Sequence, residues 1–505
     1  MSQKYLIGID TGTTNVKALL YDIDGQEVTC SSVDNEVYAD NTCSEQDMNK
    51  LWHNVLTCLQ NLINTTKIDV DSIAGIGVTG QGEGLWAIDE NGEPVSNAIL
   101  WNDGRALDLV NQLKKNDTLY KEIKKVVASY IRPGSTLTLI KWLKENRPEI
   151  YSKIKTIFTC KDWIRYKLTG NIYWELSDAS CSCVDLAKNE YAVPIFEKLG
   201  IADAVNKLPR LISATDRAGL LQKEVADKIG LKAGLPVSGG MLDIVSTAAG
   251  LGAVKEHDVC IILGTTGMTF SVLPKYKSDY EFNGWEIHMD GHSYVKGMGT
   301  MAATPNLDWA VKMLFGDKNK TETYEEITKN IANRKPFESG LIYHPHISNA
   351  GERAPFFNPK ATAQFLGIRA NTTKYDMVHA VMEGVALSIK DCLHGMTNKN
   401  KVYLSGGGAK NTVWVQMISD VLNTEILIAD ATELAAKGAA LSAGIMTGLI
   451  KDLNHIDQHF SKIKKVVKPK SDNAEKYQEL FEIYKKTQLQ LQNFWDWRFE
   501  QLSRF

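Results

Sequence analysis

Residues 5–22 of the chain, YLIGIDTGTTNVKALLYD, contain the pattern that decides the fold. A short apolar strand ends at the turn Asp10-Thr11-Gly12-Thr13-Thr14, and a second apolar strand follows. A carboxylate at a strand end beside a glycine turn is typical of phosphate sites, because backbone without a Cβ can approach a phosphate closely. We therefore predict that Asp10, Gly12, Thr13 and Thr14 bind phosphate. Taken alone, these residues fit an ordinary hairpin turn with a capping aspartate equally well.

A similar pattern recurs at residues 260–273, CIILGTTGMTFSVL. A short apolar strand, a turn of glycine and threonine and a second strand again follow one another, about half a chain after the first copy. Two equivalent turns in the two halves indicate an internal duplication. The second turn predicts another set of phosphate donors at Gly264, Thr265 and Thr266, with a plain β-turn as the alternative.

Strand and helix patterns alternate along both halves, which indicates an α/β fold with parallel strands. We expect two domains, residues 1–250 and 251–505. Asn91-Gly92 predicts a hairpin between Leu85–Ile88 and Ala98–Trp101. Further strands are expected at Glu27–Cys30, Ile73–Thr79, Val402–Ser405 and Glu425–Ala429, and helices at Met48–Leu62, Tyr375–Leu393, Val413–Leu422, Glu433–Thr447 and about Asn473–Phe505.

The composition narrows the class of protein. The chain has 505 residues, of which 44% are apolar, and its net charge of -3 lacks the basic excess of a nucleic-acid binder. No apolar stretch reaches membrane-spanning length, and the apolar run at Tyr5–Ile9 is too short for a signal peptide. The eight cysteines form no CxxC pair, which favours reduced thiols. We therefore expect a cytoplasmic protein that binds neither nucleic acid nor membrane.

A glycine run marks a second candidate ligand site. Gly406-Gly407-Gly408-Ala409 ends a predicted strand, and a helix opens after Asn411. Backbone without side chains at the end of a strand lets a flat or charged ligand lie against it. Because the run is not GxGxxG and no acidic residue is placed for a dinucleotide ribose, an adenine nucleotide is favoured over NAD. Close packing of the helix on the strand is the structural alternative.

Asp243 is the candidate catalytic residue. It follows Pro236–Leu242 and stands among small and apolar residues, where a lone carboxylate costs free energy unless it has a function or a partner. The functional interpretation is a general base for a substrate hydroxyl. The alternative is a helix N-cap, which aspartate also favours, and the sequence does not separate the two.

Two polar segments form a candidate sugar site, Gln81-Gly82-Glu83-Gly84 and Trp101-Asn102-Asp103-Gly104-Arg105. A polyhydroxylated ligand needs several donors and acceptors together with a flat apolar face. Gln81, Glu83, Asp103 and Arg105 supply the polar groups, and Trp101 supplies the face. The alternative is a solvated loop with a surface ion pair.

Together these segments resemble the FGGY carbohydrate kinases, and the resemblance covers nearly the whole chain in order. Ile9–Thr13 is similar to the family's first phosphate motif, and Gly239–Asp243 to the segment that carries its catalytic base. Gly406–Asn411 resembles its adenosine-binding loop. The long second family signature is matched at Ala363–Ile368, Asp376-Met377 and Ala380–Glu383.

The resemblance implies two actin-like (ribonuclease H-like) domains around a central cleft, with sugar bound to the N-terminal domain and nucleotide to the C-terminal one. It implies ATP and Mg²⁺ as cofactors, Asp243 as catalytic base, and Asp10 (through water) and Asp243 as magnesium ligands. Family members are often homodimers. By this resemblance, Gly264, Thr265, Thr266, Gly407, Gly408 and Asn411 join the first turn in binding nucleotide, and Gln81, Gly82, Glu83, Trp101, Asp103 and Asp243 bind substrate.

Two departures bear on the substrate. Leu139 stands where many members carry lysine, three residues before Trp142. The segment Gly80–Gly84 is unlike that of D-xylulose or glycerol kinases and looks more like that of L-xylulose and erythritol kinases. We expect phosphorylation of a terminal hydroxyl of a small sugar, such as the ketopentose xylulose (L- or D-). Erythritol or another polyol is the alternative. A non-catalytic sugar- or nucleotide-binding regulator and a sugar-independent ATPase are hypotheses from other classes.

Overall fold

The computed structural model describes residues 3–502 apart from 277, 278, 280, 281, 317–319, 395, 397, 398 and 459. The chain forms two compact units. The first unit comprises Met1–Val254, Val272–Val295 and Ala431–Lys462, and the second comprises Lys255–Ser271, Lys296–Asp430 and Ile463–Phe505. The last three residues of the expected C-terminal helix lie outside the described residues.

A mixed sheet organises the first unit. Its order is β14-β15-β6-β1-β2-β3, and β16 also pairs with β6. The hairpin of β1 and β2 is antiparallel, and β6 runs parallel to β1 on its other side. Leu6, Ile7 and Ile9 are fully buried, so β1 lies in the core of this unit. The bounds are β1 Tyr5–Thr11, β2 Asn15–Asp22, β3 Glu27–Asp34, β6 Ile73–Gly80, β14 Arg217–Leu220, β15 Pro236–Ser238 and β16 Met241–Leu242.

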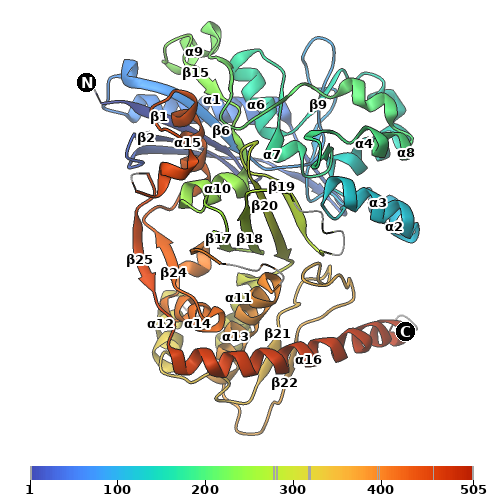
Figure 1. The fold of residues 1–505 in the computed structure, drawn as a ribbon, viewed down its shortest axis with the longest axis vertical. Coiled ribbons are helices and arrows are strands. Elements are labelled where there is room, and N and C mark those ends of the chain that lie inside the picture. The colour runs from blue at the N-terminus through green and yellow to red at the C-terminus, as the bar shows by residue number, and fades with distance from the viewer. Residues whose placement is uncertain are drawn as a thin grey trace. The chain divides into compact units, whose positions relative to one another are not determined.

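Helix α15 (Leu434–Met446) joins the first unit although it comes late in the chain. It packs on β1, β6 and α10 (Asp243–Leu251), and Figure 1 shows it beside β1 and β2. A Cβ on Gly8 would lie 1.9 Å from the Ala436 carbonyl oxygen, and one on Gly77 would lie 1.7 Å from that of Ala439. Glycine at both positions therefore permits the close approach of helix and sheet.

The predicted hairpin at Asn91-Gly92 is confirmed in part. Leu85 and Ile99 form an antiparallel bridge with backbone hydrogen bonds of 2.7 and 3.0 Å, and Ile88 bridges Pro94 across the turn. Both strands form their ladders with other segments. Strand β7 (Trp86–Ile88) pairs with β9 (Thr156–Phe158), and β8 (Ala98–Ile99) pairs with β5 (Cys43–Gln46). The other elements of this part are β4 Tyr38–Asp40, α1 Met48–Thr65, α2 Leu107–Lys115, α3 Asp117–Val127, α4 Thr136–Asn146, α5 Pro148–Tyr151, α6 Cys160–Thr169, β10 Trp174–Glu175, α7 Leu176–Ala179, β11 Val184–Asp185, β12 Glu190–Tyr191, α8 Val193–Lys198, β13 Leu211–Ile212 and α9 Lys223–Ile229.

A second sheet has the order β19-β20-β18-β17-β23-β24-β25. Its β17–β18 hairpin is antiparallel and β23 runs parallel to β17, which repeats the pattern of β2, β1 and β6. The bounds are β17 Val259–Leu263, β18 Gly267–Leu273, β19 Trp285–His288, β20 Tyr294–Thr300, α11 Thr304–Phe315, α12 Lys320–Ile331, β21 Ile342–His344, β22 Gln364–Leu366, α13 Lys374–Leu393, β23 Val402–Ser405, α14 Thr412–Leu422, β24 Ile426–Ala429, β25 Ile463–Val467 and α16 Ser471–Leu502.

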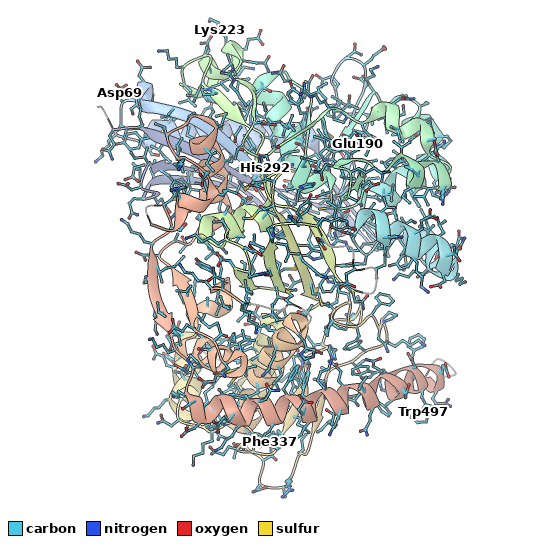
Figure 2. The ribbon with its side chains drawn as sticks, viewed as in Figure 1. Asp69, Glu190, Lys223, His292, Phe337 and Trp497 are labelled. Atoms are coloured by element: carbon cyan, nitrogen blue, oxygen red, sulfur yellow. The ribbon has the colours of Figure 1, made fainter. Side chains whose placement is uncertain are left out.

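Helix α16 packs through Tyr477, Leu480, Phe481 and Tyr484, while its C-terminal part exposes apolar side chains such as Trp497 (Figure 2). Within the described ranges, no helix is both long and apolar enough to cross a membrane. All eight cysteines are free thiols.

Candidate active site

The first glycine turn places Asp10 at the end of β1. In the sheet Asp10 stands opposite Lys17 of β2 on one side and Thr79 of β6 on the other. Lys17 in turn forms an ion pair of 2.6 Å with Glu433. Burial raises the pKa of the Asp10 carboxyl to about 7, and the positive charge of Lys17 opposes this shift. A cation bound beside the half-buried Asp10 carboxylate would stabilise its charged form.

Asp243 is the first residue of α10 and is half-buried. The N-cap position belongs to Leu242, so the alternative interpretation of Asp243 as the cap of this helix does not hold. Its Oδ1 accepts the backbone N–H of Ile244 at 2.7 Å. Burial, and next the negative charge of Asp10, raise the pKa of Asp243 to about 7. The fold therefore brings Asp10 and Asp243 close enough for their charges to interact.

These two carboxylates fit a magnesium ion. Among the described residues, no group of three or more His, Cys, Asp and Glu side chains could hold a metal. Mg²⁺ does not require such a group, since it is usually held by one or two carboxylates together with waters and substrate phosphates. Two neighbouring acids whose pKa values are raised by burial match that requirement.

Hydrogen bonds connect the first turn to the predicted sugar site. The Thr13 hydroxyl donates to Gln81 Oε1 at 2.9 Å and accepts from Trp101 Nε1 at 3.2 Å. Gln81 Nε2 donates to Gln46 at 2.8 Å. Because the Thr13 hydroxyl proton is engaged by Gln81, the backbone N–H is the group of Thr13 that remains for a phosphate. Thr14 is exposed beside it.

Glu83 is buried and has a left-handed backbone with φ of 56°. Its Oε2 accepts from the Arg132 guanidinium and from the Ser135 hydroxyl, while Oε1 has no partner within the part of the chain that the structure describes. Its backbone N–H donates to Asp178 at 3.0 Å. A buried carboxylate oxygen without a partner is a candidate acceptor for a ligand hydroxyl.

The other members of the sugar-site prediction have mainly structural contacts. Arg105 donates to both Asp103 oxygens, and the backbone N–H of Ser44 donates to one of them at 2.7 Å. The Asp103–Arg105 pair is thus a buried link that shapes the loop rather than the surface ion pair of the alternative interpretation. A Cβ on Gly82 would lie 1.9 Å from Leu242 Cδ1, so glycine lets the loop contact the segment that carries Asp243.

The second turn lies in the second unit, between β17 and β18. The carbonyl of Gly264 accepts the backbone N–H of Thr304 at 3.0 Å and its hydroxyl at 2.9 Å, so the start of α11 fixes this turn. Thr265 is exposed and Thr266 half-buried. Within the described residues their hydroxyls have no hydrogen-bond partner and can donate to a ligand.

The glycine run follows β23 in the same unit. A Cβ on Gly408 would lie 2.3 Å from Leu263 Cδ2, so close packing accounts for this glycine. A Cβ on Gly407 would have no atom within 4 Å, and packing does not explain it. Asn411 is the N-cap of α14 and accepts from the N–H groups of Val413 and Trp414, both at 3.1 Å.

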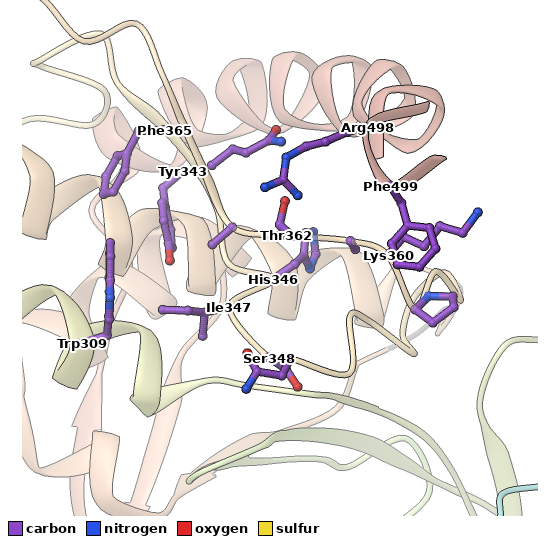
Figure 3. Close-up of a pocket in the computed structure, with 15 residues that line it drawn as sticks. Trp309, Tyr343, His346, Ile347, Ser348, Lys360, Thr362, Phe365, Arg498 and Phe499 are labelled. Atoms are coloured by element: carbon purple, nitrogen blue, oxygen red, sulfur yellow. The ribbon is translucent and has the colours of Figure 1, made fainter. Parts of the chain in front are cut away.

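A cavity of about 470 Å³ opens elsewhere in the second unit (Figure 3). Aromatic side chains, including Trp309, Tyr343 and Phe365, and the guanidinium of Arg498 line it. None of the site residues predicted from the sequence belongs to its lining.

Sequence reasoning missed several residues at this site. Arg132 and Ser135 hold Glu83, and a buried cluster around Lys161 lies behind the loop. The sequence does show several charged residues close together within mostly apolar segments, at Lys161–Arg165 and Glu175–Asp178, and such charges could have indicated a buried cluster. Which of these charges pair with one another depends on contacts between distant parts of the chain, which spacing does not encode.

Comparisons with known proteins identify the family of the chain. The model of the FGGY family of carbohydrate kinases, N-terminal domain, matches residues 5–250. That of the FGGY family of carbohydrate kinases, C-terminal domain, matches residues 259–447. The chain belongs to the FGGY family of carbohydrate kinases.

Curated relatives and solved structures match over nearly the full chain. A xylulose kinase of Staphylococcus xylosus is 31% identical over 492 residues, which cover 95% of this chain and 99% of the relative. The L-xylulose/3-keto-L-gulonate kinase of Escherichia coli is 28% identical, with coverage of 97% and 98%. The structure of a gluconate kinase from Lactobacillus acidophilus has a TM-score of 0.90 at 24% identity, over 97% of this chain and 99% of that one.

The family and the fold together define the class of enzyme. The predicted α/β fold with two actin-like domains is confirmed. The protein is a carbohydrate kinase, an enzyme that transfers a phosphoryl group to an alcohol group of a small sugar, and kinases of this family use ATP.

Proposed function

We propose that this kinase transfers the γ-phosphoryl group of ATP to a terminal hydroxyl of a ketopentose, with xylulose (L- or D-) as the leading substrate. The observation that carries the proposal is the pair Asp10 and Asp243, two neighbouring half-buried carboxylates with pKa values raised to about 7. A general base works best when its pKa lies near the operating pH. The sugar loop with Glu83 lies against the segment that leads into Asp243.

In the proposed reaction, the Asp243 carboxylate accepts the proton of the sugar hydroxyl as that oxygen attacks the γ-phosphorus. A new O–P bond forms, the bond from the γ-phosphorus to the bridging oxygen breaks, and ADP leaves with the electron pair. The backbone N–H groups of Gly12, Thr13 and Thr14 donate to phosphoryl oxygens. Positioning and electrostatic stabilisation supply most of the rate in such transfers.

Asp10, through water, and Asp243 are the residues that would hold magnesium. The ion, when bound, neutralises the charge that develops on the phosphate oxygens. The two carboxylates would orient the ion relative to the acceptor hydroxyl, because Asp10 lies near the C-terminal end of β1 and Asp243 begins α10 directly after β16 of the same sheet.

We assign sugar binding to the N-terminal domain and nucleotide binding mainly to the C-terminal domain, with 1–250 and 251–505 as the domain bounds. Gly264, Thr265 and Thr266 would donate to nucleotide phosphates. Gly407 and Gly408 would lie against the adenosine, and Asn411 would keep its free amide for the ligand while its oxygen caps α14.

The choice of xylulose rests on the relatives. The curated relatives include a xylulose kinase of Staphylococcus xylosus and an L-xylulose/3-keto-L-gulonate kinase of Escherichia coli. The segment Gly80–Gly84 departs from the sequence expected of D-xylulose kinases, and this departure keeps erythritol or another polyol as the second candidate.

A coupled assay of ADP release tests the proposed function. The panel comprises D-xylulose, L-xylulose, erythritol, glycerol and gluconate, each with ATP and Mg²⁺, and a reaction without sugar. We expect one of the two ketopentoses to give the highest kcat/KM, and no ADP release above background without sugar. A preference for erythritol would replace the substrate, and sugar-independent release at the same rate would overturn the kinase proposal.

A further inference from the structure

A cluster of five charged side chains is buried behind the candidate sugar loop. Lys161 Nζ lies 3.1 Å from Asp162, 3.3 Å from Glu175 and 3.1 Å from Asp178. Arg165 pairs with Asp162 at 2.6 Å. All five side chains are fully buried. Buried ion pairs are weak evidence for stability, because desolvation of the charges offsets their attraction. The hydrogen bonds from the cluster to neighbouring segments are therefore more informative about its role than the stabilisation from its ion pairs.

One arm of the cluster holds the sugar loop. Asp178 Oδ2 accepts from Lys161 and, at 2.6 Å, from the Thr159 hydroxyl, and Oδ1 accepts the backbone N–H of Glu83 at 3.0 Å. Glu83 has a left-handed backbone, which costs free energy at a residue with a side chain and persists only where the surroundings enforce it. Asp178 accepts the hydrogen bond from the N–H of that residue.

A second arm holds the segment of Asp243. The Ser177 hydroxyl donates to Glu175 Oε2 at 2.6 Å and accepts the backbone N–H of Leu242, the residue before Asp243, at 2.8 Å. Arg165 donates to the carbonyl of Gly239 at 2.8 Å, at the start of the same segment. Ser177 and Asp178 are neighbours on α7, so one short helix contacts both the sugar loop and the segment of the base.

We infer that Lys161, Ser177 and Asp178 form a positioning centre that keeps Glu83 and Asp243 in register for phosphoryl transfer. The inference rests on the proposed function. Lys161 neutralises the carboxylates, Asp178 fixes the loop that binds sugar, and Ser177 fixes the backbone that carries the base.

The two arms predict different kinetic effects. Ser177→Ala removes the acceptor of the Leu242 N–H and should lower kcat by about 10- to 100-fold, since a small misplacement of a reacting group has this effect. Sugar affinity, measured by calorimetry without ATP, should change little. Asp178→Asn leaves a single acceptor oxygen for two sets of donors, the Glu83 N–H on one side and Lys161 and Thr159 on the other. It should therefore loosen the Glu83 loop and weaken sugar binding about 10-fold or more, while kcat changes less.

Ser419→Ala is the matched control. Ser419 is fully buried on α14 in the second unit, and its hydroxyl donates to the carbonyls of Thr424 at 2.8 Å and Val467 at 3.1 Å. Its loss should lower the unfolding midpoint as Ser177→Ala does, with kcat and sugar affinity unchanged.

The contrary results are distinct. If Ser177→Ala and Asp178→Asn keep the kcat and sugar affinity of the wild type, or if neither folds while Ser419→Ala does, the cluster is only structural and the inference is overturned. If the wild type itself releases no ADP with any sugar, the proposed function fails instead.

Discussion

Glu83 stands out at the scale of single residues. Its φ of 56° is a left-handed value, and its buried carboxylate keeps Oε1 unpartnered within the described part of the chain. Each feature costs on the order of 1–3 kcal/mol. Backbone strain and an unpaired buried oxygen are typical of residues that are held in place for a ligand. The flanking Gly82 and Gly84 permit this turn, since a Cβ at either position would lie too close to neighbouring atoms.

Glu83→Gln tests this residue. The amide keeps the size of the side chain but loses the charge that pairs with Arg132 and accepts a sugar hydroxyl. We expect KM for the sugar to rise about 10- to 100-fold, the range for a hydrogen bond to a charged group. KM for ATP should stay unchanged. The exposed Glu90 gives the control, Glu90→Gln, and an unchanged sugar KM in Glu83→Gln would remove Glu83 from the site.

Within the glycine run, neighbouring residues separate packing from ligand binding. Gly408→Ala should destabilise the protein by about 1–3 kcal/mol, because the added methyl group would meet Leu263 at 2.3 Å. Gly407→Ala meets no atom within 4 Å and should leave stability within about 0.5 kcal/mol of the wild type. If Gly407 lies against adenosine, its variant raises KM for ATP. Denaturant unfolding and ATP kinetics of both variants measure these effects, and a normal KM for ATP in Gly407→Ala would exclude Gly407 from the nucleotide site.

At the scale of elements, α13 contains a glutamate whose ionisation opposes folding. Glu383 is buried, its Oε1 accepts from Phe337 N–H at 2.9 Å and Tyr477 OH at 3.0 Å, and burial raises its pKa from 4.5 to about 7. Between these two pH values the folded state keeps a proton that the unfolded state releases. Stability from this group is therefore present below pH 4.5 and is lost as the pH rises to about 7.

Glu383→Gln removes this pH dependence. The amide oxygen can still accept from Phe337 and Tyr477, and no charge has to be buried at high pH. We expect the stability of the variant relative to the wild type to rise between pH 4.5 and about 7, by at most about 1.4 kcal/mol per pH unit, and then to level off. Urea unfolding across this range measures the difference, with Glu475→Gln at an exposed position of α16 as control. A difference that does not change with pH would contradict the raised pKa.

Much of this element scale could be predicted from the sequence. The helices Tyr375–Leu393 and Val413–Leu422 and both glycine hairpins are confirmed within a residue or two, because periodicity and turn residues are local signals. The hairpin at Asn91-Gly92 is present as isolated antiparallel bridges, but its further strand partners could not be predicted, because they depend on which distant strands meet. There β7 and β8 pair with strands from other parts of the chain.

The candidate site shows the same division. Asp10, Gln81, Glu83 and Asp243 were predicted from local motifs, and the fold places them in one unit. Lys161 and Asp178 were missed because their partners are separated in sequence, and their proximity arises only when α6 and α7 pack.

At the scale of the whole molecule, the compact units do not follow the order of the chain. A single cut after residue 250 would separate α15 from the sheet on which it packs, whereas residues 431–462 belong to the first unit. Helix α15 contacts β6 and also β1 and α10, the elements that carry Asp10 and Asp243. Changes in α15 should therefore affect the carboxylate pair, through Glu433 and Lys17 first.

Single-turnover phosphoryl transfer by Asp243→Asn tests the central claim most directly. The asparagine cannot take the proton of the attacking hydroxyl, so the rate of sugar-phosphate formation should fall by about 100- to 10,000-fold, the usual contribution of a general base. ATP affinity, measured by equilibrium binding, should stay close to that of the wild type. Transfer at the wild-type rate in this variant would contradict the assignment of Asp243 as the base of this carbohydrate kinase.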